Sequence, residues 1–235
     1  MSKAYEEVAS RLRNQIVDGE LPRGTRLPNE TVLAEAHGVS RATIREALRL
    51  LAAQNLIRTA KGASGGSYVT RPSVDHLSES LRSGLNLLAG TQDVTLPELL
   101  EARELLEVPA ARLAARRRRP EDVGRLRQTI PTAVGGAQEE FTYNEEFHSV
   151  VLEASGNALL VIAAQPIFTV LQTHLARSTL ARRFYRAVHD HHRSIAGAIE
   201  AGDARGAERE MREHLAFLRP FYEQAWRRAL AARRG

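Results

Sequence analysis

The stretch that decides the fold of the N-terminal third is Ser40-Arg-Ala-Thr-Ile-Arg-Glu-Ala-Leu-Arg49. Ser40 is a favourable helix N-cap, and neither Gly nor Pro interrupts the residues that follow it. Apolar residues recur at helical spacing and predict one buried face: Ile44, Ala47, Leu48 and Leu51. Another face carries three arginines spaced i, i+4 and i+8, namely Arg41, Arg45 and Arg49. Such a helix suits the DNA major groove, because Arg binds phosphates and can donate two hydrogen bonds to guanine.

The residues before this helix predict a helix-turn-helix. Leu27-Pro-Asn29-Glu30 begins an earlier helix, with Asn29 as its cap, and Gly38 ends that helix. The run Ala36-His-Gly-Val-Ser40 then forms the tight turn between the two helices. A further amphipathic helix is expected over residues 2–18.

Two short apolar segments follow the second helix, at 56–58 and 68–70, and they flank the Gly-rich run 61–67. This pattern predicts a β-hairpin, or wing. The alternative is an Arg-rich surface helix beside a flexible loop, because charge runs are usually solvated faces. The turn, the cap and the wing in this order favour a winged helix-turn-helix that binds double-stranded DNA.

Roughly residues 5–70 resemble the GntR family of bacterial transcription regulators. The matching residues are Leu27-Pro28-x-Glu30, then Gly38-Val39-Ser40-Arg41-x-Thr43-x-Arg45-x-Ala47-Leu48, and a Gly-rich wing that ends at Val69. The resemblance implies that Ser40, Arg41, Thr43 and Arg45 contact bases or phosphates, and that the wing tip near Gly66 approaches the minor groove. Arg49 is added because it shares the arginine face. Thr31 stands where relatives often carry a basic residue, so the resemblance does not supply that contact here.

Composition restricts the class of protein. The 235 residues suffice for two domains with their own cores, and they include no cysteine. Disulfides and thiolate metal sites are therefore excluded, which fits a reducing cytosol. The first residues do not resemble a signal peptide, and the longest purely apolar run, 158–164, is too short to cross a bilayer. We expect a cytoplasmic protein that does not bind membranes.

Charge and turn signals divide the chain at Arg71-Pro72-Ser73. Residues 1–72 carry 11 Lys and Arg against 7 Asp and Glu, a net of +4, whereas residues 73–235 carry 22 against 21. The excess positive charge lies on the part with the DNA-reading motif, as expected for a polyanion binder. The fold prediction is mainly α: a winged helix-turn-helix domain over 1–72 and an all-α helical bundle over 73–235. The helices expected in the bundle are about 74–89, 96–116, 120–134, 138–154, 157–180, 182–201 and 203–232.

Four polar residues of the second domain can meet at one point. Asn144 and His148 are spaced i, i+4 and share a helix face. His192 lies about ten residues before the Gly202 turn and His214 about twelve after it. In two antiparallel helices with a rise of ~1.5 Å per residue, both histidines lie at similar heights. Three imidazoles and one oxygen donor are suitable ligands for Zn²⁺, Ni²⁺ or Mn²⁺, and the alternative is ordinary hydrogen-bonded or surface histidines.

Residues 74–232 are similar to the FCD ligand-binding domain of the FadR branch of the GntR family. The matching residues are Glu101-Ala-Arg103-x-x-x-Glu107, Phe147-His148, Ser155-Gly156-Asn157, His192-x-x-Ile195-x-x-Ala198-Ile199-x-x-Gly202-Asp203 and His214-Leu215. The resemblance implies a divalent metal, zinc foremost, held by an acidic residue and the three matching histidines. Asn144 stands in place of the usual Asp, so we expect weaker metal binding and an anion that completes the coordination. His189 and His191 are interpreted as surface residues or as support for the ligands.

The resemblance also implies an effector site, and Arg103 and Asn157 are its predicted residues. Arg103 falls on the apolar stripe of its helix, where an unpaired charge is costly. Its partner is either Glu107, one turn further along, or the carboxylate of a ligand, which Arg can hold with two bonds.

Three functions compete at this level. The first is a repressor that binds a palindromic operator as a homodimer and responds to a small carboxylate in the helical domain. The second is a metal-dependent enzyme acting on a small carboxylate, but the spacing offers no general base beyond Glu145 and Glu146. The third is a dimeric DNA-binding protein without an effector. The sequence favours the first.

Overall fold

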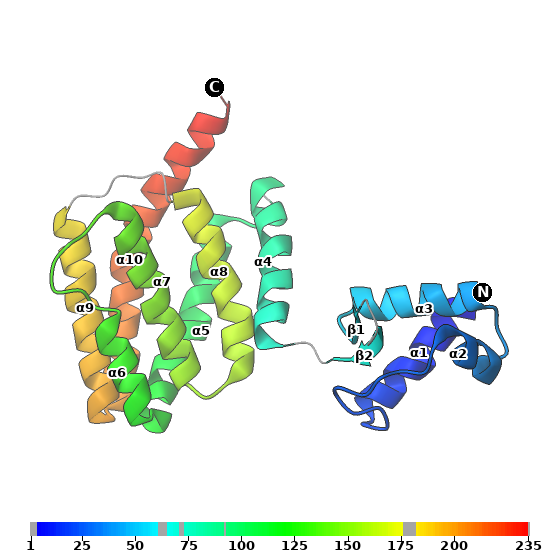
Figure 1. Cartoon of the computed structure of the whole chain (residues 1–235). Helices are drawn as coiled ribbons and strands as arrows, with labels where there is room; N and C mark the ends of the chain where they lie inside the picture. Colours follow the sequence, from blue (N-terminus) through cyan, green and yellow to red (C-terminus); the bar gives the residue numbers. More distant parts are fainter. Residues whose placement is uncertain (1–3, 61–64, 71–72, 92, 176–181, 235) are drawn as a thin grey trace. The chain divides into compact units, whose positions relative to one another are not determined.

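The computed structural model describes residues 4–60, 65–70, 73–91, 93–175 and 182–234 (Figure 1). The chain divides into two compact units, residues 1–73 and 74–235. The described residues form ten helices and one antiparallel two-stranded sheet, which confirms the predicted fold class. The predicted tip of the wing, 61–64, and most of the predicted linker, 71–72, lie outside the described residues.

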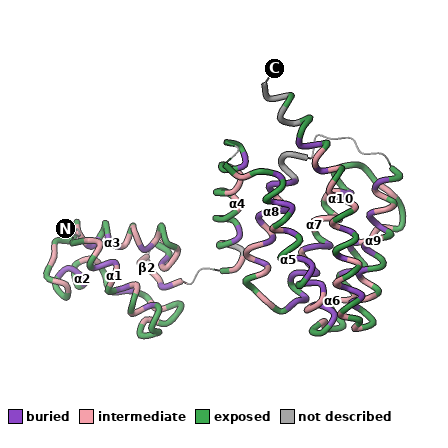
Figure 2. Tube along the Cα trace, turned by 180° about the vertical axis from the view of Figure 1, so that it is seen from behind, coloured by how far each residue is buried: buried purple, intermediate pink, exposed green. Residues whose placement is uncertain are grey.

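The N-terminal unit packs three helices: α1 (Ala4–Val17), α2 (Glu30–His37) and α3 (Arg41–Ala53). Gly38 ends α2 in the left-handed conformation with φ +64°, which costs a glycine no steric strain. The first turn of α3 is capped as predicted, because the Thr43 N–H donates to the Ser40 Oγ at 3.1 Å. The buried core draws on all three helices and the sheet (Figure 2): Val8, Leu12, Ile16, Leu33, Ile44, Ala47, Leu51, Ile57 and Val69.

The wing is the hairpin of β1 (Ile57–Ala60) and β2 (Gly66–Val69), with Ile57 opposite Val69. A third segment, which the sequence pattern did not predict, lies along the other edge of β2. The Leu27 N–H donates to the Ser67 C=O at 2.8 Å, and the Val69 N–H donates to the Thr25 C=O at 2.8 Å. The chain before α2 thereby fixes the base of the wing to the helices.

The second unit is a bundle of seven helices among the described residues. They are α4 (Val74–Thr91), α5 (Leu96–Arg117), α6 (Pro120–Gln128), α7 (Ala137–Ala154), α8 (Ala158–Leu175), α9 (Arg182–Ala201) and α10 (Ala204–Arg234). Helix α5 packs against α7, α8, α9 and α10, whereas α4 packs on α8 at the edge of the bundle (Figure 1). The side chains of α5 therefore reach the centre of the domain.

Two of the predicted helices have C-terminal ends that the structure does not reproduce or does not describe. The helix expected over 120–134 ends at Gln128, because the Thr129 hydroxyl donates to the Leu126 C=O and Pro131 cannot continue a helix. The last residues of the helix expected over 157–180 lie outside the described part of the chain. Within the described ranges, the helices are too short or too polar to traverse a bilayer.

Candidate DNA interface and buried histidine site

Helix α3 presents the three predicted arginines on the surface of the first unit. Arg41, Arg45 and Arg49 are exposed along one side, opposite the buried Ile44 and Leu51. The Ser40 hydroxyl caps the N-terminus of α3 by accepting the Thr43 N–H, and the Thr43 hydroxyl lies 2.9 Å from the same oxygen. The cap sets the start of α3, so the arginine spacing is held on a rigid helix.

Arg45 is also tied to α2 by an ion pair that the sequence reasoning missed. Its Nη2 lies 3.0 Å from Glu30 Oε2, and its Nε donates to Glu30 Oε1 at 3.3 Å. The hydrogen bond from Arg45 holds the pKa of Glu30 below its usual range. The Arg45 side chain remains 51% exposed, and exposed pairs of this kind are weak. The pair therefore orients Arg45 without removing it from the surface.

Gly66 begins the second strand of the wing, at φ +149°. A Cβ at this position would lie 2.8 Å from Arg26 Nε, and Arg26 Nη2 donates to the Gly65 C=O at 2.5 Å. The glycine thus allows Arg26 to approach the end of the hairpin that is nearer the predicted wing tip.

Three histidines from three helices meet in the core of the bundle. His148 lies on α7, His192 on α9 and His214 on α10, and all three are buried. Their ligand-capable nitrogens all lie within 4.8 Å of one another, and His148 Nε2 is 3.2 Å from His214 Nε2. Helices α9 and α10 meet at Gly202, which adopts φ +73°. The expected meeting of His192 and His214 follows from this turn.

The residues fit a divalent metal. Two nitrogens bound to a tetrahedral zinc at about 2.0–2.1 Å lie roughly 3.3 Å apart, close to the separation of His148 Nε2 and His214 Nε2. His192 Nε2 and Asn144 Oδ1 are buried and have no hydrogen-bond partner among the described residues. Burial lowers the pKa of His192 and of His214 well below the usual value, so both rings are neutral ligands. The three histidines can therefore hold an ion, and the unpartnered Asn144 oxygen, one turn before His148 on α7, stays the predicted fourth ligand.

Neighbouring side chains fix the rings. Phe147 stacks on His192 with ring centroids 3.8 Å apart and planes 8° apart. Glu107 Oε2 lies 2.7 Å from His148 Nδ1. Burial lowers the pKa of His148, against the opposing charge of Glu107. The contact between Glu107 and His148 joins α5 to α7, which sequence spacing could not reveal.

Arg103 is fully buried and already has protein partners. Its Nε donates to Glu107 Oε1 at 2.6 Å, and Nη1 donates to the Tyr222 hydroxyl at 3.2 Å. Its Nη2 lies 3.4 Å from His148 Nε2, and the guanidinium stacks 4.4 Å from the Phe168 centroid. Burial by itself would lower the pKa of Arg103, but the charges of and hydrogen bonds to Glu107 and Tyr222 together raise it. Arg103 therefore pairs with Glu107 and also lies beside the histidines.

Two other polar residues have hydrogen-bond partners that the sequence did not reveal. His189 is buried rather than superficial, because its Nε2 lies 2.6 Å from Glu140 Oε2 inside the bundle. Asn157 lies in the turn before α8, where its Oδ1 accepts the Leu159 N–H at 3.1 Å. This bond uses the Oδ1 of Asn157, and its contact with an effector stays a prediction.

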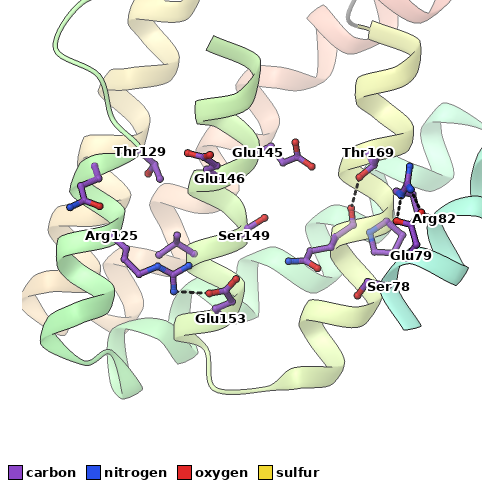
Figure 3. Close-up of a pocket in the computed structure, with 14 residues that line it drawn as sticks. Ser78, Glu79, Arg82, Arg125, Thr129, Glu145, Glu146, Ser149, Glu153 and Thr169 are labelled. Atoms are coloured by element: carbon purple, nitrogen blue, oxygen red, sulfur yellow. Dashed lines mark hydrogen bonds and ion pairs between the residues drawn. The ribbon is translucent and has the colours of Figure 1, made fainter. Parts of the chain in front are cut away.

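A groove of about 820 Å³ lies over a different face of α7, between α6 on one side and α4 and α8 on the other (Figure 3). Acids outnumber bases among its charged lining residues, which are Glu79, Glu145, Glu146, Glu153, Arg82 and Arg125. Arg125 pairs with Glu153 at 2.6 Å, and Arg82 pairs with Glu79. The surplus of negative charge disfavours a carboxylate here, so the histidine site is the better candidate for an anion.

Helix α3, the second helix of the helix-turn-helix, is capped, carries the three arginines and is followed by a wing. Together with a separate helical domain, these features are typical of a DNA-binding transcription regulator. Residues 4–69 match the model of the bacterial regulatory proteins of the gntR family, and residues 98–217 match the FCD domain. The chain belongs to the GntR family, in the group that carries an FCD domain.

Proteins similar to this chain are regulators, and the similarity covers most of the length of each of them. The "Putative L-lactate dehydrogenase operon regulatory protein" of Escherichia coli K12 is 31% identical over 220 residues, 91% of this chain and 84% of the relative. The HTH-type transcriptional regulator LutR of Bacillus subtilis is 31% identical over 213 residues, 85% of this chain and 92% of the relative. The solved structure of Streptococcus agalactiae GntR is 27% identical, has a TM-score of 0.58, and is matched over 92% of this chain and 99% of that chain. These relatives confirm the prediction of a regulator rather than an enzyme.

Proposed function

We propose that this regulator is a repressor whose operator affinity is set by a small carboxylate bound at the buried histidine site together with a divalent metal, zinc foremost. His148, His192, His214 and Asn144 hold the ion, and Arg103 lies next to it. The single observation that carries this proposal is the convergence of three buried imidazoles, whose pKa values burial lowers, with their ligand-capable nitrogens within 4.8 Å of one another. A bound ion supplies positive charge and a coordination position for a carboxylate oxygen.

The charge of the site supports an anionic effector. All four proposed ligands are neutral, so they leave the +2 charge of the ion uncompensated. Glu107, the nearest buried carboxylate among the described residues, is already paired with Arg103. An anion is therefore favoured, and the name of the E. coli relative suggests L-lactate as the first probe.

The DNA-binding part of the proposal rests on α3. This helix begins at its cap, Ser40, and carries the other predicted contact residues Arg41, Thr43, Arg45 and Arg49. The remaining one, Gly66, lies in the wing. We propose that α3 enters the major groove of a palindromic operator, one half-site for each protomer of a homodimer. An effector that binds one conformation better shifts the dimer toward it and thereby changes operator affinity.

Helix α4 supports the homodimer. Three of its leucines, Leu77, Leu81 and Leu88, are 41–47% exposed. Together with Gly84 they follow one another along the helix at intervals of four, three and four residues. This spacing is that of a helix-pairing seam, and exposed apolar stripes mark protein–protein contacts. A second copy of the same helix is the partner that a two-fold symmetric operator requires.

We expect Leu81→Glu to convert the dimer to a monomer. Two carboxylates at the middle of a symmetric seam would repel each other and lose their hydration. Sedimentation velocity measures the change, with Leu159→Glu as the control because Leu159 is also exposed but lies on α8. A dimer that persists unchanged in Leu81→Glu would place the interface elsewhere.

We expect Asn144→Asp to bind zinc more tightly and L-lactate more weakly. The carboxylate is a stronger donor, and it removes one unit of positive charge from the position that the anion would occupy. Chelator-competition titration gives the zinc affinity, and calorimetry on zinc-loaded protein gives the lactate affinity. If zinc affinity stays the same in Asn144→Asp, residue 144 is not a ligand.

A further inference from the structure

Glu107 occupies a central place in the bundle that the proposed ligand set does not use. It is 1% exposed and lies on α5, the helix that packs against α7, α8, α9 and α10. Its carboxylate contacts two functional groups, the Arg103 guanidinium and the His148 ring. Oε1 accepts from Arg103 Nε at 2.6 Å, and Oε2 lies 2.7 Å from His148 Nδ1. Among the described residues, neither His192 nor His214 has such a carboxylate.

The contact with Glu107 determines how the His148 ring is oriented. The carboxylate lies 2.7 Å from Nδ1, and Arg103 Nη2, which can only donate, lies 3.4 Å from Nε2; together these contacts favour the neutral tautomer with its proton on Nδ1 and its lone pair on Nε2. That nitrogen is the one that lies 3.2 Å from His214 Nε2. A carboxylate behind a ligating histidine fixes the tautomer and the ring orientation and increases the basicity of the ligand.

The same carboxylate positions Arg103. The guanidinium donates two hydrogen bonds to Glu107, and these hold its Nη2 at 3.4 Å from His148 Nε2. When that nitrogen is committed to an ion, its lone pair is no longer available to Nη2. One N–H of Arg103 would then lack its acceptor, and the carboxylate oxygen of an effector could accept it.

We propose that Glu107 is a positioning residue that aligns His148 for the metal and Arg103 for the effector carboxylate, so that the two binding events reinforce each other. This inference rests on the metal site of the proposed function. It assigns Glu107 no contact with the ion or the effector.

The first test compares two matched substitutions, Glu107→Gln and Glu140→Gln. Both remove the charge of a buried glutamate that lies within 2.7 Å of a histidine nitrogen, but the partner of Glu140 is His189, outside the ligand set. Zinc affinity is measured by competition with a chelating dye. We expect Glu107→Gln to weaken it by roughly 10–100-fold, the usual effect of losing such a partner, and Glu140→Gln to leave it unchanged. Equal zinc affinity in Glu107→Gln and wild type, or an equal loss in both variants, overturns the proposal.

A second variant distinguishes the positioning role of Glu107 from an effect of its charge and from misfolding of the protein. Arg103→Met/Glu107→Leu keeps the net charge of wild type and avoids a buried guanidinium without its partner. A purely electrostatic role for Glu107 predicts wild-type zinc affinity in this double variant, whereas positioning predicts that the loss persists. Circular dichroism checks that each variant is folded.

A readout in the zinc-free protein distinguishes this proposal from the proposed function. Nitrogen-15 spectra of the histidine rings report which nitrogen of His148 carries the proton. We expect the Nδ1–H form in wild type and a mixture of tautomers in the double variant. Failure of wild type to bind zinc contradicts the proposed metal site. An unchanged His148 tautomer in the double variant contradicts the role of Glu107 by itself.

Discussion

Arg45→Ala should abolish specific operator binding and leave the protein folded. A base-reading Arg contributes about 1–3 kcal/mol per contact, and a symmetric dimer makes the contact twice. The expected loss of roughly 2–6 kcal/mol corresponds to at least a tens-fold weaker operator affinity. Folding should be little affected, because the pair with Glu30 is exposed and such pairs contribute little stability. Fluorescence anisotropy at physiological salt measures the loss, on a DNA site selected with wild-type protein.

Two control variants make this result specific to base reading. Arg193→Ala removes the same charge from α9, where Arg193 pairs with Asp190 on the surface of the other domain, and should leave affinity unchanged. Arg45→Lys keeps the positive charge but cannot donate the bidentate hydrogen bonds that Arg makes to guanine. It should therefore lose specificity for the operator and retain binding to random DNA. Unchanged operator affinity in Arg45→Ala would remove Arg45 from the recognition surface.

His192→Ala/His214→Ala should lose zinc binding while it retains DNA binding. The substitution leaves only His148 and the neutral Asn144 oxygen, so the loss should exceed the roughly 10–100-fold effect of removing a single supporting partner. DNA binding should survive because α3 lies in a different compact unit. Elemental analysis after zinc loading and chelator competition measure the change, and circular dichroism confirms the fold. Zinc retained at wild-type stoichiometry would show that the ion binds elsewhere.

Much of the fold followed from local signals in the sequence. Ser40, Gly38 and Gly202 each act at a helix end through the chemistry of that residue type, so the start of α3, the end of α2 and the turn before α10 were predictable. The meeting of His192 and His214 followed from that last turn and the helical rise. Pro131 was an available signal for the end of α6, although the predicted helix extended past it.

The rest of the site depends on how helices pack, which spacing does not encode. Glu107 was visible as a neighbour of Arg103 one turn away, but its contact with His148 exists only because α5 packs on α7. The bond from Arg103 to Tyr222 spans 119 positions, and the pair of His189 with Glu140 spans 49. For Asn157 the structure shows a local turn bond, and the effector contact that its motif position implies stays a prediction.

The most direct test is the operator affinity of zinc-loaded wild type, measured across a panel of small carboxylates that begins with L-lactate. The proposed function predicts that at least one acid weakens operator binding, and that the effect disappears in zinc-free protein and in His192→Ala/His214→Ala. An operator affinity that no acid changes would contradict control by a carboxylate. An effect of the same size in the double-histidine variant would contradict the buried site formed by His148, His192 and His214.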